Sequence, residues 1–377
     1  MKFLGSVLFL ALAAAEPGYL ASNLSPQYTF EQFQVDFSKN YTCPKEKEHR
    51  RKVFETALNV ALKHNADPAQ NWKRAINQFA DRTPEEFRNS HGWLPSWGLD
   101  LKFEPYPEIP ADFKLSDLPP SVDWRNVTTP VKNQGMCGSC WAFSSTENVE
   151  SRVAIDTGKL IELSPQNLVS CDPNPKHCGG QGGCRGSVPE LAFDFVIKNG
   201  LASEASYPYV SGHTSKDEDC KKIAPAAFVK SYVKLQANNY TQVMHALATV
   251  GPLAINVDAI PMQSYGGGVF DGCSMEKTHI DHVIQLVGYG HDDDTELDYW
   301  LVRNSWDTTW GEAGYMRLTR HTPPNDKWCG IDIYPADGTG CDGGPGTVTT
   351  CGSCGLLYDV SYPTGGTVAP SWFSKTQ

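Results

Sequence analysis

The stretch QGMCGSCWAFS at residues 134–144 decides how the rest of this sequence is interpreted. A glycine-rich turn carries two cysteines and leads into residues that can enter a helix without a Gly or Pro to stop it. Cys140 then stands at the N-terminus of a helix predicted over 141–158, where unpaired backbone amides carry partial positive charge. That charge favours the thiolate, which is the nucleophilic form of cysteine. We therefore expect the chemistry of this protein to take place at Cys140.

Composition limits the possible partners. The 377 residues are 40% hydrophobic and 20% charged, enough for a sizeable core in one large or two modest domains. The net charge of −11 offers no basic field that could release counterions from nucleic acid, so we expect no nucleic-acid partner.

The N-terminus indicates a secretory route. Lys2 is followed by an apolar run over residues 3–15 that ends in small side chains, which predicts a signal peptide at 1–15. No other segment approaches the roughly 20 apolar residues of a membrane span, so we expect a soluble mature protein with no membrane contact. Twelve cysteines on a secreted chain favour disulfides. Asn40, Asn126 and Asn239 begin glycosylation sequons, although each match could also arise by chance.

A second pair of candidate residues comes from a predicted hairpin. Residues 279–287 and 299–304 are apolar, β-branched runs separated by an Asp-rich turn. A hairpin centred near residue 293 places His282 nearly opposite Asn304, with Cβ atoms about 5 Å apart. Asn304 could then accept a hydrogen bond from one imidazole nitrogen and leave the other to face a thiol. Asp281 points to the opposite face, because side chains alternate along a strand, and is a poor candidate for orienting the ring.

Several motifs resemble the active-site segments of papain and the cathepsins. They are CGSCW at 137–141, DH at 281–282, GYG at 288–290 and NSW at 304–306. Two alternatives exist for the cysteine pair: both cysteines in disulfides, or a Cys-x-x-Cys redox pair of the thioredoxin kind. A thioredoxin-like site needs a small βαβ context, whereas this chain has a His and an Asn well downstream, which favours the protease.

The resemblance implies a role for each candidate residue. Cys140 is the nucleophile, His282 the general acid and base, Asn304 the residue that orients His282, and Gln134 the donor that stabilises the oxyanion. Trp306 would shield the His–Asn contact from water. His279 and His291 compete for the histidine role, and the cross-strand partner favours His282. Asp307 replaces a family Gly beside Trp306.

The implied fold is α+β with two lobes. A helical lobe carries Cys140, an antiparallel β-barrel-like lobe carries His282 and Asn304, and a helical propeptide precedes both. Residues 1–15 form the signal peptide, 16–116 the inhibitory propeptide and 117–377 the peptidase domain, with an insertion at about 332–353 and a flexible tail at 364–377.

The propeptide assignment depends on a helix predicted at 45–65, which contains neither Gly nor Pro. Its amphipathic pattern alone would indicate a helix with a solvated face. Four of six motif positions match the propeptides of cathepsin L-like proteases, and residues 77–81 (NQFAD) match most of a second motif. The matching positions are Glu46, Arg50, Phe54 and Asn65. Ala57, Ala61 and Ala75 stand where the family has Asn, Ile and Gly, and we expect looser packing there.

The resemblance also implies disulfides and a substrate pocket. The family pairs would be Cys137–Cys184, Cys171–Cys220 and Cys273–Cys329, although Cys354 could replace Cys329 as the partner of Cys273. The pairing of Cys178, Cys341, Cys351 and Cys354 cannot be derived from sequence, and a zinc site at Cys351 and Cys354 is an alternative that secretion disfavours. The substrate-binding residues would be Gly186, Val188, Pro189, Trp306 and Asp359, with Asp359 at the base of the S2 pocket accepting Arg or Lys at P2.

The sequence therefore predicts a secreted or lysosomal cysteine endopeptidase made as a zymogen. We expect a monomer that needs no cofactor or metal, acts on protein or peptide substrates and is inhibited by its own propeptide. A disulfide oxidoreductase would need Cys137 reduced. A catalytically silent homologue would need a lesion in the Cys–His–Asn set, and none is visible. An acyltransferase would need a different acceptor pocket.

Overall fold

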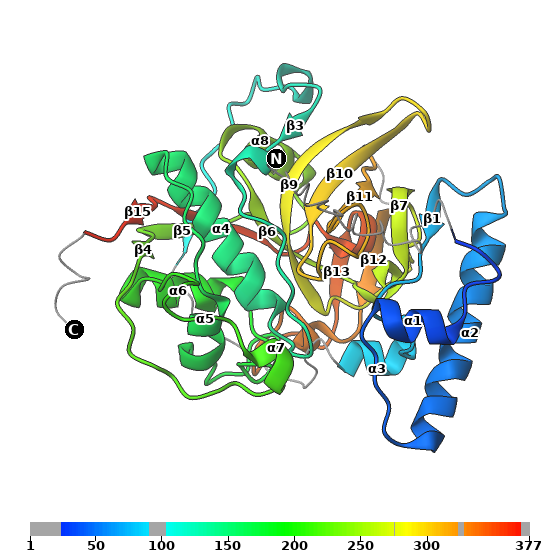
Figure 1. Cartoon of the computed structure of the whole chain (residues 1–377). Coiled ribbons are helices and arrows are strands. Elements are labelled where there is room, and N and C mark those ends of the chain that lie inside the picture. Colours follow the sequence, from blue (N-terminus) through cyan, green and yellow to red (C-terminus); the bar gives the residue numbers. More distant parts are fainter. Residues whose placement is uncertain (1–23, 90–102, 275, 323–327, 371–377) are drawn as a thin grey trace, which may run out of the picture.

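A long sheet runs through the middle of the molecule, with helices gathered on one side and the N-terminal region attached to its far edge (Figure 1). The computed structural model describes residues 24–89, 103–274, 276–322 and 328–370. The predicted signal peptide lies outside these residues. Within them, the strand order of the sheet is β1-β7-β11-β10-β9-β6-β14-β5-β2, and β3 pairs with β9.

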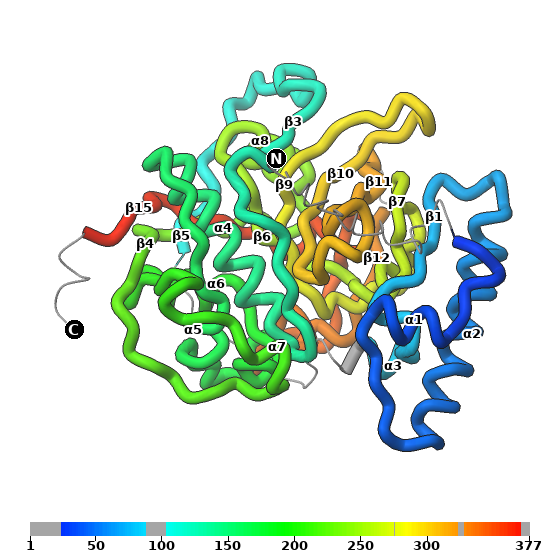
Figure 2. The backbone as a smooth tube through the Cα atoms, viewed as in Figure 1, coloured from blue at the N-terminus to red at the C-terminus, as the bar shows by residue number. Residues whose placement is uncertain are grey.

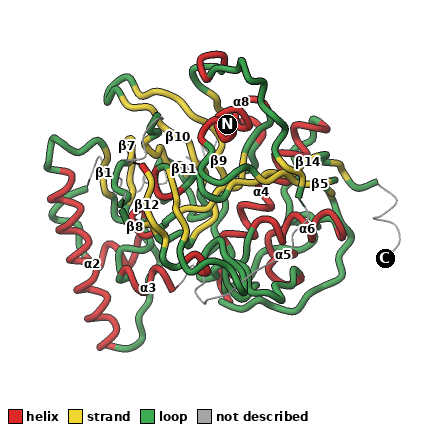
Figure 3. Tube along the Cα trace, turned by 180° about the vertical axis from the view of Figure 1, so that it is seen from behind, coloured by secondary structure: helices red, strands yellow, loops and turns green. Residues whose placement is uncertain are grey.

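The N-terminal region is a small helical unit with its own core. Its elements are α1 (Phe30–Asp36), α2 (Pro44–Asn65), β1 (Trp72–Arg74) and α3 (Pro84–Asn89), whereas β2 (Glu104–Pro105) pairs with β5 at the opposite end of the sheet. The predicted helix at 45–65 is confirmed as α2, which begins with a proline at its first turn, where no amide donor is lost. Phe54 and Leu58 of α2 pack on Phe30 and Phe33 of α1. The unit is joined to the sheet because β1 pairs with β7, and α2 lies at the same edge in both views (Figure 1 and Figure 3).

The helical lobe is built around α4 (Cys140–Thr157), with α5 (Pro165–Cys171), α6 (Pro189–Asn199) and α7 (Ser211–Thr214) beside it. The helix predicted over 141–158 is confirmed, and Gly158 ends it with a left-handed φ of 71°. The first twelve residues of α4, from Cys140 to Ser151, are all buried. Small side chains such as Ala142 and Ser145 let neighbouring elements approach this helix closely.

The β-rich lobe contains most of the sheet and carries α8 on one face. The described elements are β5 (Ser231–Lys234), α8 (Tyr240–Thr249), β6 (Leu253–Val257), β7 (Tyr265–Phe270), β9 (His282–Asp292), β10 (Leu297–Arg303), β11 (Tyr315–Thr319) and β14 (Val360–Thr364), with β3 (Val122–Asp123) on β9. The predicted hairpin is confirmed as β9–β10. Its register differs from the expected one by three residues up to Leu301, which pairs with Gly288, and by two after the bulge that follows, where Arg303 pairs with Gln285 rather than residue 283.

The C-terminal insertion forms a separate small sheet. Its strands are β8 (Lys277–Thr278), β12 (Cys329–Asp332) and β13 (Val348–Cys351), in the order β13-β12-β8. The tail predicted to be flexible from residue 364 is paired in part, because β15 (Thr367–Val368) pairs with β4 (Ala227–Phe228). This pair lies on the side of the molecule opposite to the N-terminal helices (Figure 2). Residues 371–377 lie outside the described residues.

Five disulfides staple the protease part. Cys137–Cys184 and Cys171–Cys220 pair as the resemblance implied, and Cys178 pairs with Cys341. The implied Cys273–Cys329 pair is wrong: Cys273 joins Cys354, and Cys329 joins Cys351. The reason is that β12 and β13 align Cys329 directly opposite Cys351, which leaves Cys354 for Cys273. These two bridges also remove the cysteines of the zinc alternative.

Candidate active site

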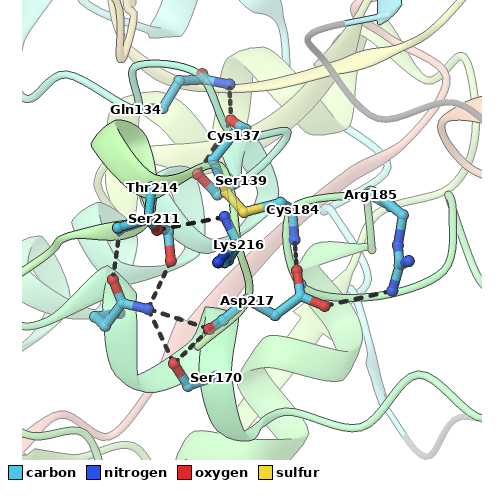
Figure 4. Close-up of a disulfide and its surroundings, with 12 residues drawn as sticks. Gln134, Cys137, Ser139, Ser170, Cys184, Arg185, Ser211, Thr214, Lys216 and Asp217 are labelled. Atoms are coloured by element: carbon cyan, nitrogen blue, oxygen red, sulfur yellow. Dashed lines mark hydrogen bonds and ion pairs between the residues drawn. A yellow bond between two sulfur atoms is a disulfide. The ribbon is translucent and has the colours of Figure 1, made fainter. Parts of the chain in front are cut away.

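Cys140 is the first residue of α4 and carries a free, buried thiol. Its neighbour in the CGSC motif, Cys137, is bonded to Cys184 (Figure 4). That bridge fixes the turn, because the amide of Gly138 also donates to the Cys184 carbonyl at 2.9 Å. With Cys137 already bonded elsewhere, the two cysteines of the motif do not form a redox pair with each other.

His282 and Asn304 meet across the β9–β10 hairpin. The Nε2 of His282 donates to the Oδ1 of Asn304 at 2.9 Å, and both side chains are buried. The contact forms although the observed register places Asn304 diagonally to His282, because diagonal neighbours remain within reach of a long side chain. The Trp306 ring stacks on the imidazole with a centroid separation of 4.7 Å and an interplanar angle of 22°. Trp306 therefore covers the His–Asn contact.

The start of β9 meets the N-terminus of α4 at the sulfur. The backbone amides of Val283 and Trp141 favour the ionised form of Cys140, so Val283, next to His282, lies close to the thiol. Burial outweighs these amides and raises the pKa of Cys140 to about 12. Burial also lowers the pKa of His282 to about 4, against the hydrogen bond to Asn304. Burial therefore favours the neutral form of both the thiol and the imidazole.

Gln134 links the two lobes beside the motif. Its Nε2 donates to the Cys137 carbonyl at 3.1 Å, and its Oε1 accepts from the Ser305 hydroxyl at 2.7 Å. Its backbone amide donates to the Ser305 carbonyl at 2.9 Å. The side chain is 2% exposed. Ser305 thus fixes which end of the amide faces the motif; it stands inside the quoted NSW motif, yet sequence reasoning gave it no role.

The N-terminal region covers the Trp306 side of the site. Phe79 and Phe87 pack edge-on against Trp306, with centroid separations of 5.4 and 5.3 Å. Gln78 donates to the Trp306 carbonyl at 2.6 Å. Asn77 donates to the Gln263 carbonyl at 2.8 Å, which ties the same segment to the β-rich lobe. The NQFAD motif is therefore the segment that contacts the site.

The predicted S2 residues have partners that sequence reasoning missed. The Nζ of Lys234 lies 2.8 Å from Asp359 and 2.9 Å from Glu190, the residue after Pro189. Both carboxylates are buried. Burial first, and Glu190 second, raise the pKa of Asp359 to about 6. Asp359 is thus one of two buried carboxylates that share the half-buried ammonium of Lys234, and the only signal in the sequence was two charged residues inside otherwise apolar runs.

The remaining residues singled out in the sequence have the following surroundings. Val188 is buried and caps α6, while Gly186 has a φ of 83° and donates to the Gly138 carbonyl at 3.2 Å. Asp281 accepts from the amide of Ala259 at 3.0 Å, consistent with its exclusion as the orienter of His282. Asp307 has a φ of 71°, a left-handed conformation that suits the glycine expected there.

Among the described residues no group of three His, Cys, Asp or Glu side chains is arranged to hold a metal ion. Within the same part of the chain, no helix has the length and apolar character required to cross a membrane.

The fold and the site together define a cysteine peptidase that still carries an inhibitory N-terminal region. Residues 118–339 match the papain family of cysteine proteases, and residues 30–87 match the cathepsin propeptide inhibitor domain. The chain belongs to the papain family.

Similar proteins indicate which group of papain-family proteases this chain resembles. The cathepsin L-like proteinase of Phaedon cochleariae is 35% identical over 338 residues, which cover 86% of this chain and 97% of that protein. Procathepsin L of Mus musculus is 36% identical over 301 residues, covering 76% and 84%. The structure of digestive procathepsin L 3 from Tenebrio molitor larval midgut superposes with a TM-score of 0.71 at 29% identity, covering 89% and 97%. This chain is a cathepsin L-like cysteine protease in its zymogen form.

Proposed function

We propose that Cys140, His282, Asn304 and Gln134 form the catalytic set of this protease. The observation that carries the proposal is the free thiol of Cys140 at the start of α4, beside the strand on which His282 is held by Asn304 at 2.9 Å. In the first half-reaction the Cys140 sulfur attacks the peptide carbonyl carbon, and the proton on His282 goes to the leaving amine. Water, deprotonated by His282, then cleaves the thioester and restores the thiol.

Gln134 serves the oxyanion. Its Nε2 has a second hydrogen besides the one given to the Cys137 carbonyl, and it lies at the turn that leads into Cys140. Together with the backbone amide of Cys140 it would stabilise the negative charge of the tetrahedral intermediate.

The attached propeptide favours the neutral form of the catalytic pair by covering Trp306. Burial is the largest influence on both groups, raising the pKa of Cys140 and lowering that of His282. Removing Phe79 and Phe87 from Trp306 would let water reach the imidazole, which reduces the cost of charging it. The thiolate–imidazolium pair is therefore a property of the mature enzyme, and its own propeptide is the first partner of the site.

The S2 pocket is formed by Gly186, Val188, Pro189 and Asp359, with Trp306 on the other side of the cleft. At acidic pH Asp359 is protonated and the Lys234 ammonium lies beside Glu190, so no unpaired negative charge faces the P2 side chain and we assign a preference for apolar P2 side chains there. Above pH 6, where Asp359 is ionised, two carboxylates face one ammonium and a basic P2 side chain becomes acceptable.

The biology follows from the zymogen form. We assign the enzyme to the secretory pathway, delivered to a lysosome or vacuole or outside the cell, as a monomeric endopeptidase. Signal peptide removal near residue 15 and propeptide release near residue 116 complete its maturation. Asn40 and Asn126 are exposed and suit glycosylation, whereas Asn239 caps α8 with its side chain.

Labelling tests the catalytic assignment. An epoxide inhibitor of thiol proteases should modify one cysteine of the acid-processed enzyme, and mass spectrometry of the peptides should locate it at residue 140. The Cys140→Ser protein, processed by added wild-type enzyme, should take up no label. Equal labelling of both proteins would refute the assignment.

A further inference from the structure

A pocket of about 460 Å³ lies on the propeptide, between helix α2 and the segment that follows β1. Val53, Ala57 and Val60 of α2 supply one wall, and Ala75 and Ile76 supply the other. Space is left in part because position 57 is Ala, where the related propeptides have Asn. The volume falls within the range of pockets that hold small organic molecules.

The ionisable side chains that line the pocket are all basic. His49, Lys52, Arg74 and Arg82 line it, and no acidic side chain is among its described lining residues. The chain as a whole has a net charge of −11, so four basic groups around one apolar cavity are not a consequence of composition. The complementary ligand is an anion with an apolar body.

The two arginines lack carboxylate partners. Within the described residues neither Arg74 nor Arg82 has an Asp or Glu at ion-pair distance, whereas Arg50 and Arg51 on α2 both do. Arg74 donates to the Ser264 hydroxyl at 2.5 Å and lies over the Trp72 ring, but its buried Nε has no hydrogen-bond partner there. Arg82 lies over the Phe79 ring and contacts the sulfur of Met136.

Burial lowers the pKa of both arginine side chains; for Arg74 no neighbouring charge among the described residues offsets it, and for Arg82 the carboxylates of Asp81 and Glu86 offset it only in part. A carboxylate or phosphate is the partner that a guanidinium pairs with most strongly, through two parallel hydrogen bonds. These two guanidinium groups therefore supply N–H donors for an acidic head group at the lining of an apolar pocket.

We propose that this pocket binds a single-chain amphiphile with an acidic head group, of the size of a medium-chain fatty acid, and that the bound amphiphile stabilises the zymogen. The apolar chain lies against Val53, Ala57 and Ile76, and the head group pairs with Arg74 and Arg82. The regulatory part of the proposal rests on the zymogen function stated above, whereas the binding part does not.

The location explains why binding affects activation. Gln263 and Ser264 of the protease domain complete the rim, so a ligand contacts both parts of the molecule. At the same place Gln263 donates to the Phe79 carbonyl at 3.2 Å, which holds the NQFAD segment against the protease domain. Most of the wall leaves with the propeptide, so the mature enzyme cannot bind the ligand and the zymogen alone is stabilised.

Binding is measured first, on the full-length Cys140→Ser zymogen, which cannot process itself. Calorimetric titration with decanoate, kept below its micellar concentration, should give one saturable site, and decyltrimethylammonium should give none. Arg74→Met combined with Arg82→Met should weaken decanoate binding at least about tenfold. Arg51→Met is the matched control, because that arginine is paired with Glu31 at 2.6 Å outside the pocket, and it should bind normally.

A steric variant makes the test independent of charge. Ala57→Leu fills the cavity without harming helix propensity and should abolish decanoate binding while the melting temperature is retained. Unchanged affinity in Ala57→Leu, equal binding of the cationic amphiphile, or tighter competition by an acidic peptide would each overturn the proposal.

Activation is measured second, on the wild-type zymogen at pH 5.5, which is above the ordinary carboxyl pKa of about 4.3, with the dissociation constant of decanoate taken at the same pH. At a decanoate concentration one hundred times its dissociation constant, autoprocessing through the opened form should slow by about a hundredfold, and processing of Ala57→Leu should be unaffected. Binding without any slowing would overturn the regulatory part. A protein that binds decanoate but never processes itself would count instead against the proposed function.

Discussion

Ser305 and Gln134 allow the oxyanion assignment to be tested quantitatively. In Gln134→Ala the amide donor is lost, and the loss of one such donor costs about 3 to 4 kcal/mol in the transition state, so kcat should fall by about a hundredfold or more. In Ser305→Ala the donor remains but loses the 2.7 Å hydrogen bond that orients it. A buried neutral hydrogen bond contributes about 1 kcal/mol, so kcat should fall only about fivefold.

The double variant separates orientation from other effects. If Ser305 acts through Gln134, then Ser305→Ala should have no further effect on kcat in the Gln134→Ala background, giving a coupling energy close to the single Ser305→Ala effect. The assay is hydrolysis of a fluorogenic dipeptide amide by processed enzyme, with active sites titrated by an epoxide inhibitor. KM should change little in all three variants.

The melting temperature of each variant must be measured as well, because the side chains of Gln134 and Ser305 are both buried. Melting temperatures within a few degrees of wild type would assign the losses to the transition state. The reasoning fails if Gln134→Ala retains more than a third of wild-type kcat, or if the two substitutions are additive.

Three further predictions concern charge pairs. The amide of Thr83 and the guanidinium of Arg50 lower the pKa of Glu86 despite its burial, so this carboxylate stabilises the propeptide above about pH 4.5 and ceases to do so as pH falls through the lowered pKa. Glu86→Gln should therefore speed autoprocessing up to about fivefold at pH 5.5 and have a progressively smaller effect as the pH is lowered below 4.5; an effect that does not decline would refute this. For the S2 cluster, the ratio of Arg to Leu cleavage at P2 should rise with pH through about 6 in wild type and stay flat in Asp359→Ala, and a flat wild-type ratio would discard the assignment. Although burial opposes it, the 2.6 Å contact with Asp337 raises the pKa of His279, so His279→Gln should lower the melting temperature at pH 5 and much less above the raised pKa; a larger loss at pH 8 would contradict the sign.

Local patterns in the sequence were enough for the elements that carry the site. A run without Gly or Pro from residue 45 predicted α2, and Gly158 marked the end of α4, because helix formation and termination depend on residues within a turn or two. The apolar runs around His282 and Asn304 predicted the β9–β10 hairpin for the same reason.

The register of the hairpin and the pairing of the cysteines could not be predicted as well from the sequence. Pairing in the β9–β10 hairpin is shifted by three residues from the expected register, and the bulge after Leu301 reduces the shift to two; nothing in the local sequence marks either. Cys273 joins Cys354 because β12 and β13 bring Cys329 opposite Cys351, a contact that depends on how two strands pair. Cysteine spacing alone leaves many pairings open.

Ionisation is where sequence reasoning reached its limit. The position of Cys140 at a helix N-terminus correctly indicated a local field that favours the thiolate, yet burial outweighs that field and raises the pKa to about 12. Likewise Asp359 could be identified as an acid near the S2 pocket, but its pairing with Lys234 depends on β5 lying beside β14. Helices, turns and local fields depend on neighbouring residues and can be predicted from the sequence. Solvation and charge pairing depend on which distant segments exclude water from a group, and only the packed tertiary structure determines that.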